Sequence, residues 1–170
     1  MNIVLLDSYP DTYYCINIGT GNAGQIFKSN VDAKITTAKG LLLRTSDAEG
    51  IVKAHLWNVT GTPGVDAVPT GTQIAESSPI DVTTLSEGAA WVEFTFSNGS
   101  ILKDTYYAIT FKAELTVGAI NIGGDNTTLT ADGNWCLYEF GDWYADNTID
   151  LMFYVYGDTS TDSSMFLEFF

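Results

Sequence analysis

Apolar and polar residues alternate through the middle of the chain, and this period of two predicts β-strands. Val52, Ala54 and Leu56 fall on one face of an extended segment, because successive side chains of a strand point to opposite sides. His55 and Trp57 fall on the other face. The first face is therefore expected to join a core, and the second to face water or a partner.

The same alternation returns in two later segments, which flank a turn signal at Asn98-Gly99. Proline and glycine at Pro63-Gly64 and at Pro69-Thr70-Gly71 mark a turn-rich loop before them. In the first segment the positions expected to face the core are Val92, Phe94 and Phe96. In the second, one face carries Tyr107, Ile109, Phe111 and Ala113, and the other carries Tyr106, Ala108, Thr110 and Lys112.

Strand signals and polar turns continue over the rest of the chain, without a helical period. Further strands are predicted over residues 2–6, 13–18, 31–37, 41–44, 119–122, 135–140 and 149–156. A turn is predicted at Lys39-Gly40 and a loop over 141–146. The strand at 119–122 is expected to lie within a long loop region over 118–133. About ten short strands are typical of a sandwich. The predicted fold class is all-β, an antiparallel two-sheet β-sandwich of jelly-roll-like form. One domain is expected over residues 1–157, followed by an extension over 158–170.

The segment Gly19–Gly24 (GTGNAG) matches the G-x-G-x-x-G pattern of dinucleotide-binding loops. In such a loop a helix follows, and its N-terminus holds the pyrophosphate. Here the following residues, 25–28 (QIFK), favour a strand. The segment is therefore predicted to be a glycine-rich hairpin loop, and not a cofactor site.

Short motifs spread over roughly residues 5–157 resemble those of the choice-of-anchor R type of β-sandwich domain. They are Leu6-Asp7-Ser8-Tyr9, Gly24-Gln25-Ile26-Phe27-Lys28, Pro69-Thr70-Gly71-Thr72, Ile74-Ala75-Glu76-Ser77, Asp81-Val82-Thr83-Thr84-Leu85, Phe94-Thr95-Phe96, Thr105-Tyr106-Tyr107-Ala108-Ile109 and Phe153-Tyr154-Val155-Tyr156-Gly157. The resemblance implies a jelly-roll-like sandwich similar to carbohydrate-binding modules, of a kind found in phage and bacterial surface proteins. It implies no known catalytic residues.

Acidic side chains outnumber basic ones, with 21 Asp and Glu against 7 Lys and Arg and a net charge of −14. Nucleic acids and anionic membranes are bound by clustered cations, so neither is an expected partner. No stretch approaches the roughly 18 apolar residues of a membrane helix, and the N-terminus lacks the pattern of a signal peptide. The protein is therefore expected to be made in the cytoplasm.

Candidate metal and sulfur chemistry is sparse. Cys15 and Cys136 lack metal-ligand spacing and are expected either as buried thiols or as a disulfide. No cofactor is predicted, although loop acids and amides near the C-terminal strand could hold a structural calcium ion or simply be solvated. These residues are Asp125, Asn126, Asp132, Asn134, Asp142, Asp146, Asn147 and Asp150.

The chain is not expected to be an enzyme. His55 is the single histidine, it falls within a predicted strand, and no G-x-S-x-G nucleophile motif occurs in the sequence. Among the 21 acidic residues no pair stands out as the two carboxylates that a glycosidase requires.

Aromatic residues give the clearest candidates for ligand contact. Flat rings serve as platforms for sugars, with nearby amides and acids as hydrogen-bonding partners. The same rings could instead be covered by loops or by an adjacent subunit, so both interpretations stay open. The candidate glycan contacts are Trp57, Trp91, Trp135, Trp143 and Tyr144.

The last six residues of the chain are mostly large and apolar. Leaving such side chains in water beside an acidic surface would favour aggregation. They are therefore expected either to add an edge strand to their own sandwich or to dock on a neighbouring subunit or another protein. The residues of this predicted protein interface are Met165, Phe166, Leu167, Phe169 and Phe170.

Together these features predict a virion structural protein, either a phage capsid decoration protein or a tail or fibre component. Its partners would be copies of itself or a major capsid or tail protein, and it would be located in the virion. The alternative is a carbohydrate-binding adhesion module of a surface protein, extracellular or at the cell surface, with glycans as partners. A third interpretation is an accessory domain detached from an enzyme.

Overall fold

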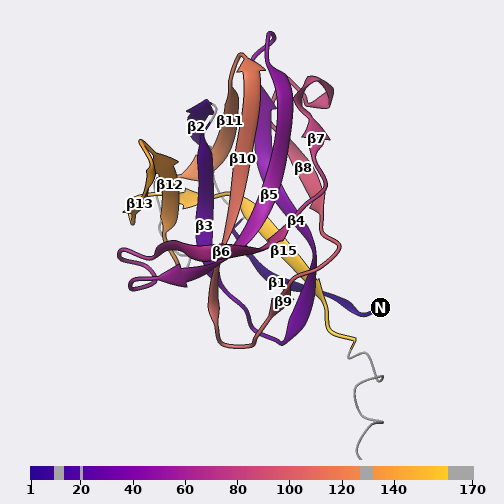
Figure 1. The fold of residues 1–170 in the computed structure, drawn as a ribbon, viewed down its shortest axis with the longest axis vertical. Coiled ribbons are helices and arrows are strands. Elements are labelled where there is room, and N and C mark those ends of the chain that lie inside the picture. Colours follow the sequence, from indigo (N-terminus) through magenta and orange to yellow (C-terminus); the bar gives the residue numbers. More distant parts are fainter. Residues whose placement is uncertain (10–13, 20, 127–131, 161–170) are drawn as a thin grey trace, which may run out of the picture.

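The computed structural model describes residues 1–9, 14–19, 21–126 and 132–160 and arranges them as two antiparallel β-sheets packed face to face (Figure 1). We name the eight-stranded sheet A and the seven-stranded sheet B. Their mutual packing confirms the predicted fold class, an all-β two-sheet sandwich.

Sheet A runs in the order β1-β15-β4-β11-β14, with β2 beside β11 and with β8 and β9 beside β4. Its strands are β1 (Ile3–Tyr9), β2 (Tyr14–Gly19), β4 (Ala33–Arg44), β8 (Ala90–Thr95), β9 (Ser100–Ile101), β11 (Ile120–Asp125), β14 (Asp150–Leu151) and β15 (Phe153–Asp158). The predicted edge strand at residues 2–6 is confirmed as β1, which continues to Tyr9. The strand predicted at 119–122 continues to Asp125.

Sheet B runs in the order β13-β12-β3-β10-β5-β6, with β7 beside β5. Its strands are β3 (Asn22–Lys28), β5 (Glu49–Thr60), β6 (Val68–Glu76), β7 (Ile80–Asp81), β10 (Tyr106–Val117), β12 (Trp135–Glu139) and β13 (Asp142–Asp146). A short 3-10 helix, η1 (Val82–Thr84), follows β7. The central strands β10 and β5 are 12 residues long each, and with β3 they contribute part of the groove described below.

Phenylalanine side chains from both sheets meet in the core. Phe111 of sheet B lies 5.2 Å from Phe94 of sheet A between ring centroids, and Phe27 of sheet B lies 6.2 Å from Phe153 of sheet A. All four rings are fully buried. The predicted core positions agree with this arrangement, except that Val92 is only half-buried.

The turn predicted at Lys39-Gly40 is wrong, because residues 33–44 form the single strand β4. Gly40 pairs with Phe153 of β15 and with Val92 of β8 in the middle of sheet A. A Cβ atom at this position would lie 3.0 Å from Cζ of Phe111. The glycine therefore makes room for a core ring and does not reverse the chain.

The hairpin loop predicted at Gly19–Gly24 is also wrong. The strands on either side do not pair with each other, since β2 pairs with β11 in sheet A whereas β3 pairs with β10 and β12 in sheet B. The segment carries the chain from one sheet to the other. The strand predicted after the glycines is confirmed as β3, so no helix follows them to hold a pyrophosphate.

Candidate functional site

The outer face of sheet B carries a groove with a volume of about 720 Å³. Strands β3, β5, β6 and β10 and the β12–β13 hairpin contribute most of its lining, and Ile18 of β2 and Gly21 just before β3 contribute the rest. We call it the sheet-B groove. Its lining residues are Ile18, Gly21, Asn22, His55, Trp57, Gln73, Lys112, Tyr138, Glu139, Phe140 and Trp143.

Strand alternation points polar side chains into the groove from neighbouring strands. Asn22 of β3 lies opposite Tyr138 of β12 and Lys112 of β10 in the strand pairing. Two residues further along, Thr110 of β10 lies opposite His55 of β5. Strands β12, β3, β10 and β5 are consecutive in the sheet, so these groups meet on one surface.

Three aromatic rings form a continuous wall beside these polar groups. Trp143 lies edge to face against Trp57, with ring centroids 6.2 Å apart, and against Tyr138, with centroids 5.2 Å apart. The Trp57 indole Nε1 donates a hydrogen bond of 3.1 Å to Oγ1 of Thr110, which fixes the indole over β10. The wall is therefore held in place by ring contacts and by this hydrogen bond.

The β12–β13 hairpin ends in a two-residue turn, Phe140-Gly141, between the paired residues Glu139 and Asp142. Both turn residues have positive φ, 52° and 95°, as the type I′ turn of a tight hairpin requires. The loop predicted over 141–146 is therefore wrong, because Asp142–Asp146 forms β13. Asn-Gly or Asp-Gly is the usual sequence of this turn. Because phenylalanine stands at the first position here, the sequence does not indicate the turn.

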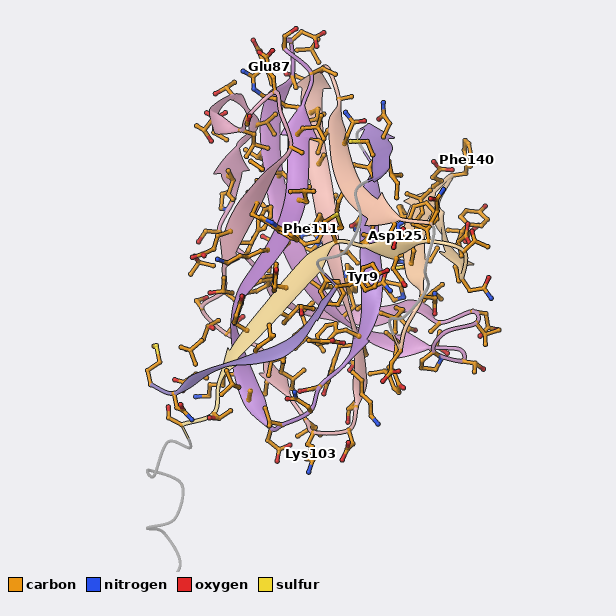
Figure 2. The ribbon with its side chains drawn as sticks, turned by 180° about the vertical axis from the view of Figure 1, so that it is seen from behind. Tyr9, Glu87, Lys103, Phe111, Asp125 and Phe140 are labelled. Carbon is orange, nitrogen blue, oxygen red and sulfur yellow. The ribbon has the colours of Figure 1, made fainter. Side chains whose placement is uncertain are left out.

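Phe140 combines two unfavourable features at the rim of the groove. Its side chain is 95% exposed and projects from the hairpin tip (Figure 2). Its left-handed backbone conformation costs about 1 kcal/mol or more for a residue with a Cβ atom. Residues in strained backbone conformations cluster at functional sites, which makes Phe140 a candidate contact residue of the groove.

Two buried polar side chains on the groove floor lack hydrogen-bond partners among the described residues. They are Asn22, at Oδ1, and His55, at both ring nitrogens. His55 Nε2 lies 3.2 Å from Oε2 of Glu76, but this contact does not meet the geometry of a hydrogen bond. Burial lowers the pKa of His55, against the opposing effect of Glu76. The imidazole is therefore neutral at pH 7, with one donor and one acceptor to offer.

This environment predicts a pH-dependent stability. Because the folded-state pKa of His55 is below the unfolded value of about 6.5, the unfolded chain binds the proton more readily, and stability falls as the pH drops below 6.5. We expect the His55→Gln variant to lose this part of the slope in urea denaturation between about pH 7 and pH 5. The pKa of Glu76 is lowered by its hydrogen bond from Lys53, so protonation of Glu76 changes the stability only below about pH 4.5. Parallel profiles for the two proteins would contradict the prediction.

The five predicted aromatic contacts do not share one site. Trp57 and Trp143 meet in the groove, whereas Trp91 lies in β8 of sheet A, 40% exposed, with its ring 4.8 Å from that of Tyr154. Trp135 begins β12, as the predicted strand over 135–140 requires, and is only 8% exposed. Tyr144 is exposed on β13, outside the groove lining. Sequence reasoning missed Tyr138 and Phe140.

The predicted calcium ligands have separate structural partners. Asp125 accepts a 2.7 Å hydrogen bond from the Tyr9 hydroxyl, which lies beside it (Figure 2), and Asp150 accepts one of 2.8 Å from Gln25. Asn134 donates to the backbone carbonyls of Ala67 and Trp135. Within the part of the chain that the structure describes, no group of three or more His, Cys, Asp or Glu residues could hold a metal ion. The expectation of no cofactor, with a structural calcium ion as the alternative, stays a prediction.

Cys15 and Cys136 do not form a disulfide. Cys15 belongs to β2 in sheet A, whereas Cys136 is buried in β12 in sheet B. Burial raises the pKa of the Cys136 thiol, so this sulfur stays protonated and unreactive. Of the two predicted alternatives, the disulfide is wrong, and the buried thiol is confirmed for Cys136 but not for Cys15, which is only partly buried.

The predicted protein interface, Met165, Phe166, Leu167, Phe169 and Phe170, lies outside the described residues. β15 ends at Asp158, and the boundary between a domain over 1–157 and an extension over 158–170 stays a prediction. In the described ranges no helix has both the length and the apolar character needed to cross a bilayer.

Comparisons with known proteins place the fold but not the family. No family model and no curated protein matches the chain, so the resemblance to the choice-of-anchor R domain stays a prediction. The fold is similar to one in the crystal structure of the cysteine protease and lectin-like domains of Cwp84, a surface layer associated protein of Clostridium difficile, with a TM-score of 0.59 and 12% identity. The match covers 86% of this chain and 34% of that chain, so this chain spans about a third of its length. At this identity the likeness shows the β-sandwich fold alone.

Proposed function

We propose that this β-sandwich is a non-catalytic carbohydrate-binding module and that the sheet-B groove is its binding site. The observation that carries the proposal is the aromatic wall of Trp57, Trp143 and Tyr138 beside buried polar atoms without partners. Rings stack on the apolar faces of sugars, and the polar groups orient the hydroxyls. The likeness to a structure that includes a lectin-like domain supports the same class.

The charges around the groove favour a neutral oligosaccharide. Lys112 lies 2.6 Å from a carboxylate oxygen of Glu114, and Lys53 lies 2.9 Å from one of Glu76. Both cations are therefore largely neutralised before any ligand arrives. The net charge of −14 also repels anionic ligands at low ionic strength.

Tryptophan fluorescence tests the proposal directly. We expect a panel of soluble neutral oligosaccharides to include at least one that changes the emission saturably, because two of the four tryptophans line the groove. Acidic oligosaccharides of the same length are the matched comparison and are expected to bind more weakly. If no oligosaccharide of either panel changed the emission saturably, a glycan-binding role would be contradicted. Preferential binding of the acidic oligosaccharides would contradict the proposal that the ligand is neutral.

A single substitution at Phe140 separates binding from stability. Asparagine tolerates the left-handed conformation of the turn better than phenylalanine does, so Phe140→Asn is expected to raise the free energy of unfolding by about 1 kcal/mol. The same change is expected to weaken oligosaccharide binding, because it removes an apolar ring from the groove rim. Tyr144→Asn, on the same hairpin but outside the groove, is the control for binding. If Phe140→Asn bound as tightly as the natural chain, Phe140 would have no role at the site.

A location outside the cell or at its surface follows from a glycan-binding role and stays a prediction. The virion role was predicted chiefly from the apolar residues 165–170, which lie outside the described chain, and it stays a prediction as well. The two roles are compatible, since a virion protein can carry a glycan-binding domain.

A further inference from the structure

Strand β1 forms one edge of sheet A. In the described part of the chain it pairs on one side only, with β15. Edge strands usually carry lysine, proline or other features that block pairing with a further strand. The sequence of β1, IVLLDSY, has neither lysine nor proline, and its register irregularity comes only after Leu5. The first half of β1 is therefore a regular edge.

This edge also exposes apolar side chains. Ile3 is 46% exposed and Leu5 is 44% exposed, whereas the neighbouring residues Val4 and Leu6 pack against or within the core. An additional strand beside β1 would cover part of Ile3 and Leu5 on one face of the sheet. On the other face, the side chains of the additional strand would pack beside Val4 and enlarge the core.

The described part of the chain ends next to the start of this edge. Asn2 accepts a 3.1 Å hydrogen bond at its carbonyl oxygen from the amide of Thr159, and its own amide donates to Oδ1 of Asp158 at 2.8 Å. The two segments lie side by side in Figure 1. Ten residues remain beyond Ser160, and their last six are MFLEFF.

We propose that the free edge of β1 is a docking site for residues 165–170 of a second copy of this chain, which add to sheet A as an extra strand. The sequence suits both faces of such a strand. Met165, Leu167 and Phe169 would share the face that continues the core, and Glu168 would fall on the outer face beside Ile3 and Leu5. This interface lies on the opposite sheet from the groove and does not depend on a glycan-binding role.

Geometry favours exchange between two copies over a return onto the same molecule. To reach its own β1, the segment would have to cross the start of β1 and run parallel to it, because β15 is antiparallel to β1. Parallel pairing is slightly less stable per residue than antiparallel pairing, and a second copy can approach the edge in the antiparallel orientation. A second copy offers the same edge without the crossing, and a reciprocal exchange closes a two-fold dimer.

Sedimentation velocity on full-length variants tests the proposal. The natural chain is expected to be a dimer. Leu5→Lys, which charges the edge, and the double variant Leu167→Asp/Phe169→Asp, which charges the tail, are each expected to weaken dimerisation at least tenfold. Val117→Lys is the matched control, because Val117 is 45% exposed near the end of β10, far from this edge in the sheet order.

Mixing the two defective variants gives the sharpest result. The edge variant retains an intact tail and the tail variant retains an intact edge, so a mixture is expected to recover dimers that neither forms alone. A monomeric natural chain would overturn the proposal, including the case in which the tail folds back on its own edge. A dimer that survives both variants, or a mixture that stays monomeric, would also overturn it. Circular dichroism verifies that each variant is folded.

Discussion

Replacing Phe111 with alanine is expected to lower the free energy of unfolding by about 3–5 kcal/mol, the usual loss for a fully buried phenylalanine. The ring is 0% exposed, contacts Phe94 of the facing sheet, and lies against Gly40, which has no side chain to move into the vacated space. The residue of β4 that faces the ring therefore cannot fill the cavity. Because domains of this size have total stabilities of about 5–15 kcal/mol, the variant would be close to unfolding.

Urea denaturation followed by tryptophan fluorescence measures this loss. Phe140→Ala is the matched control, since it removes the same atoms from a ring that is 95% exposed, and it is expected to change stability by no more than about 0.5 kcal/mol. A loss below about 1 kcal/mol for Phe111→Ala would mean that this ring is not at the centre of a packed sandwich.

Replacing Trp57 with alanine is expected to weaken oligosaccharide binding about tenfold to a hundredfold. Loss of a large stacking surface is worth about 1.5–3 kcal/mol, and each 1.4 kcal/mol is about a factor of ten in affinity. Trp57 also supports Trp143 through their edge-to-face contact, so the wall would lose more than one ring.

Trp91→Ala is the matched control for this prediction. Trp91 is a partly exposed tryptophan on sheet A, away from the groove, and its loss is expected to leave the dissociation constant unchanged within a factor of two or so. Isothermal titration calorimetry measures the dissociation constants of the two variants. If Trp91→Ala lost affinity and Trp57→Ala did not, the binding site would lie on sheet A.

Local alternation predicted the strands because each strand has one buried face. It could not predict which strands are neighbours, since β2 and β3 are adjacent in sequence yet belong to different sheets. Gly40 illustrates the same limit. A glycine beside a lysine resembles a turn locally, and only the position of Phe111 across the core explains why the strand contains it.

The groove was predictable only in part for related reasons. The outward orientation of Trp57 follows from the period of two, but its contact with Trp143 joins strands that are far apart in sequence. Tyr138 and Phe140 were missed because the turn at Phe140-Gly141 lacks the usual asparagine or aspartate. Glycine between the alternating segments 135–139 and 142–146 was the signal that could have revealed the hairpin.

The most direct test of the central claim, that the sheet-B groove binds glycans, is an NMR titration of the indole N–H signals. The chain has four tryptophans, so four signals can be assigned by single substitutions. On titration with the tightest-binding neutral oligosaccharide of the panel, the signals of Trp57 and Trp143 are expected to shift saturably, while that of Trp91 stays unchanged. A saturable shift of Trp91 alone, with Trp57 and Trp143 unmoved, would contradict the account.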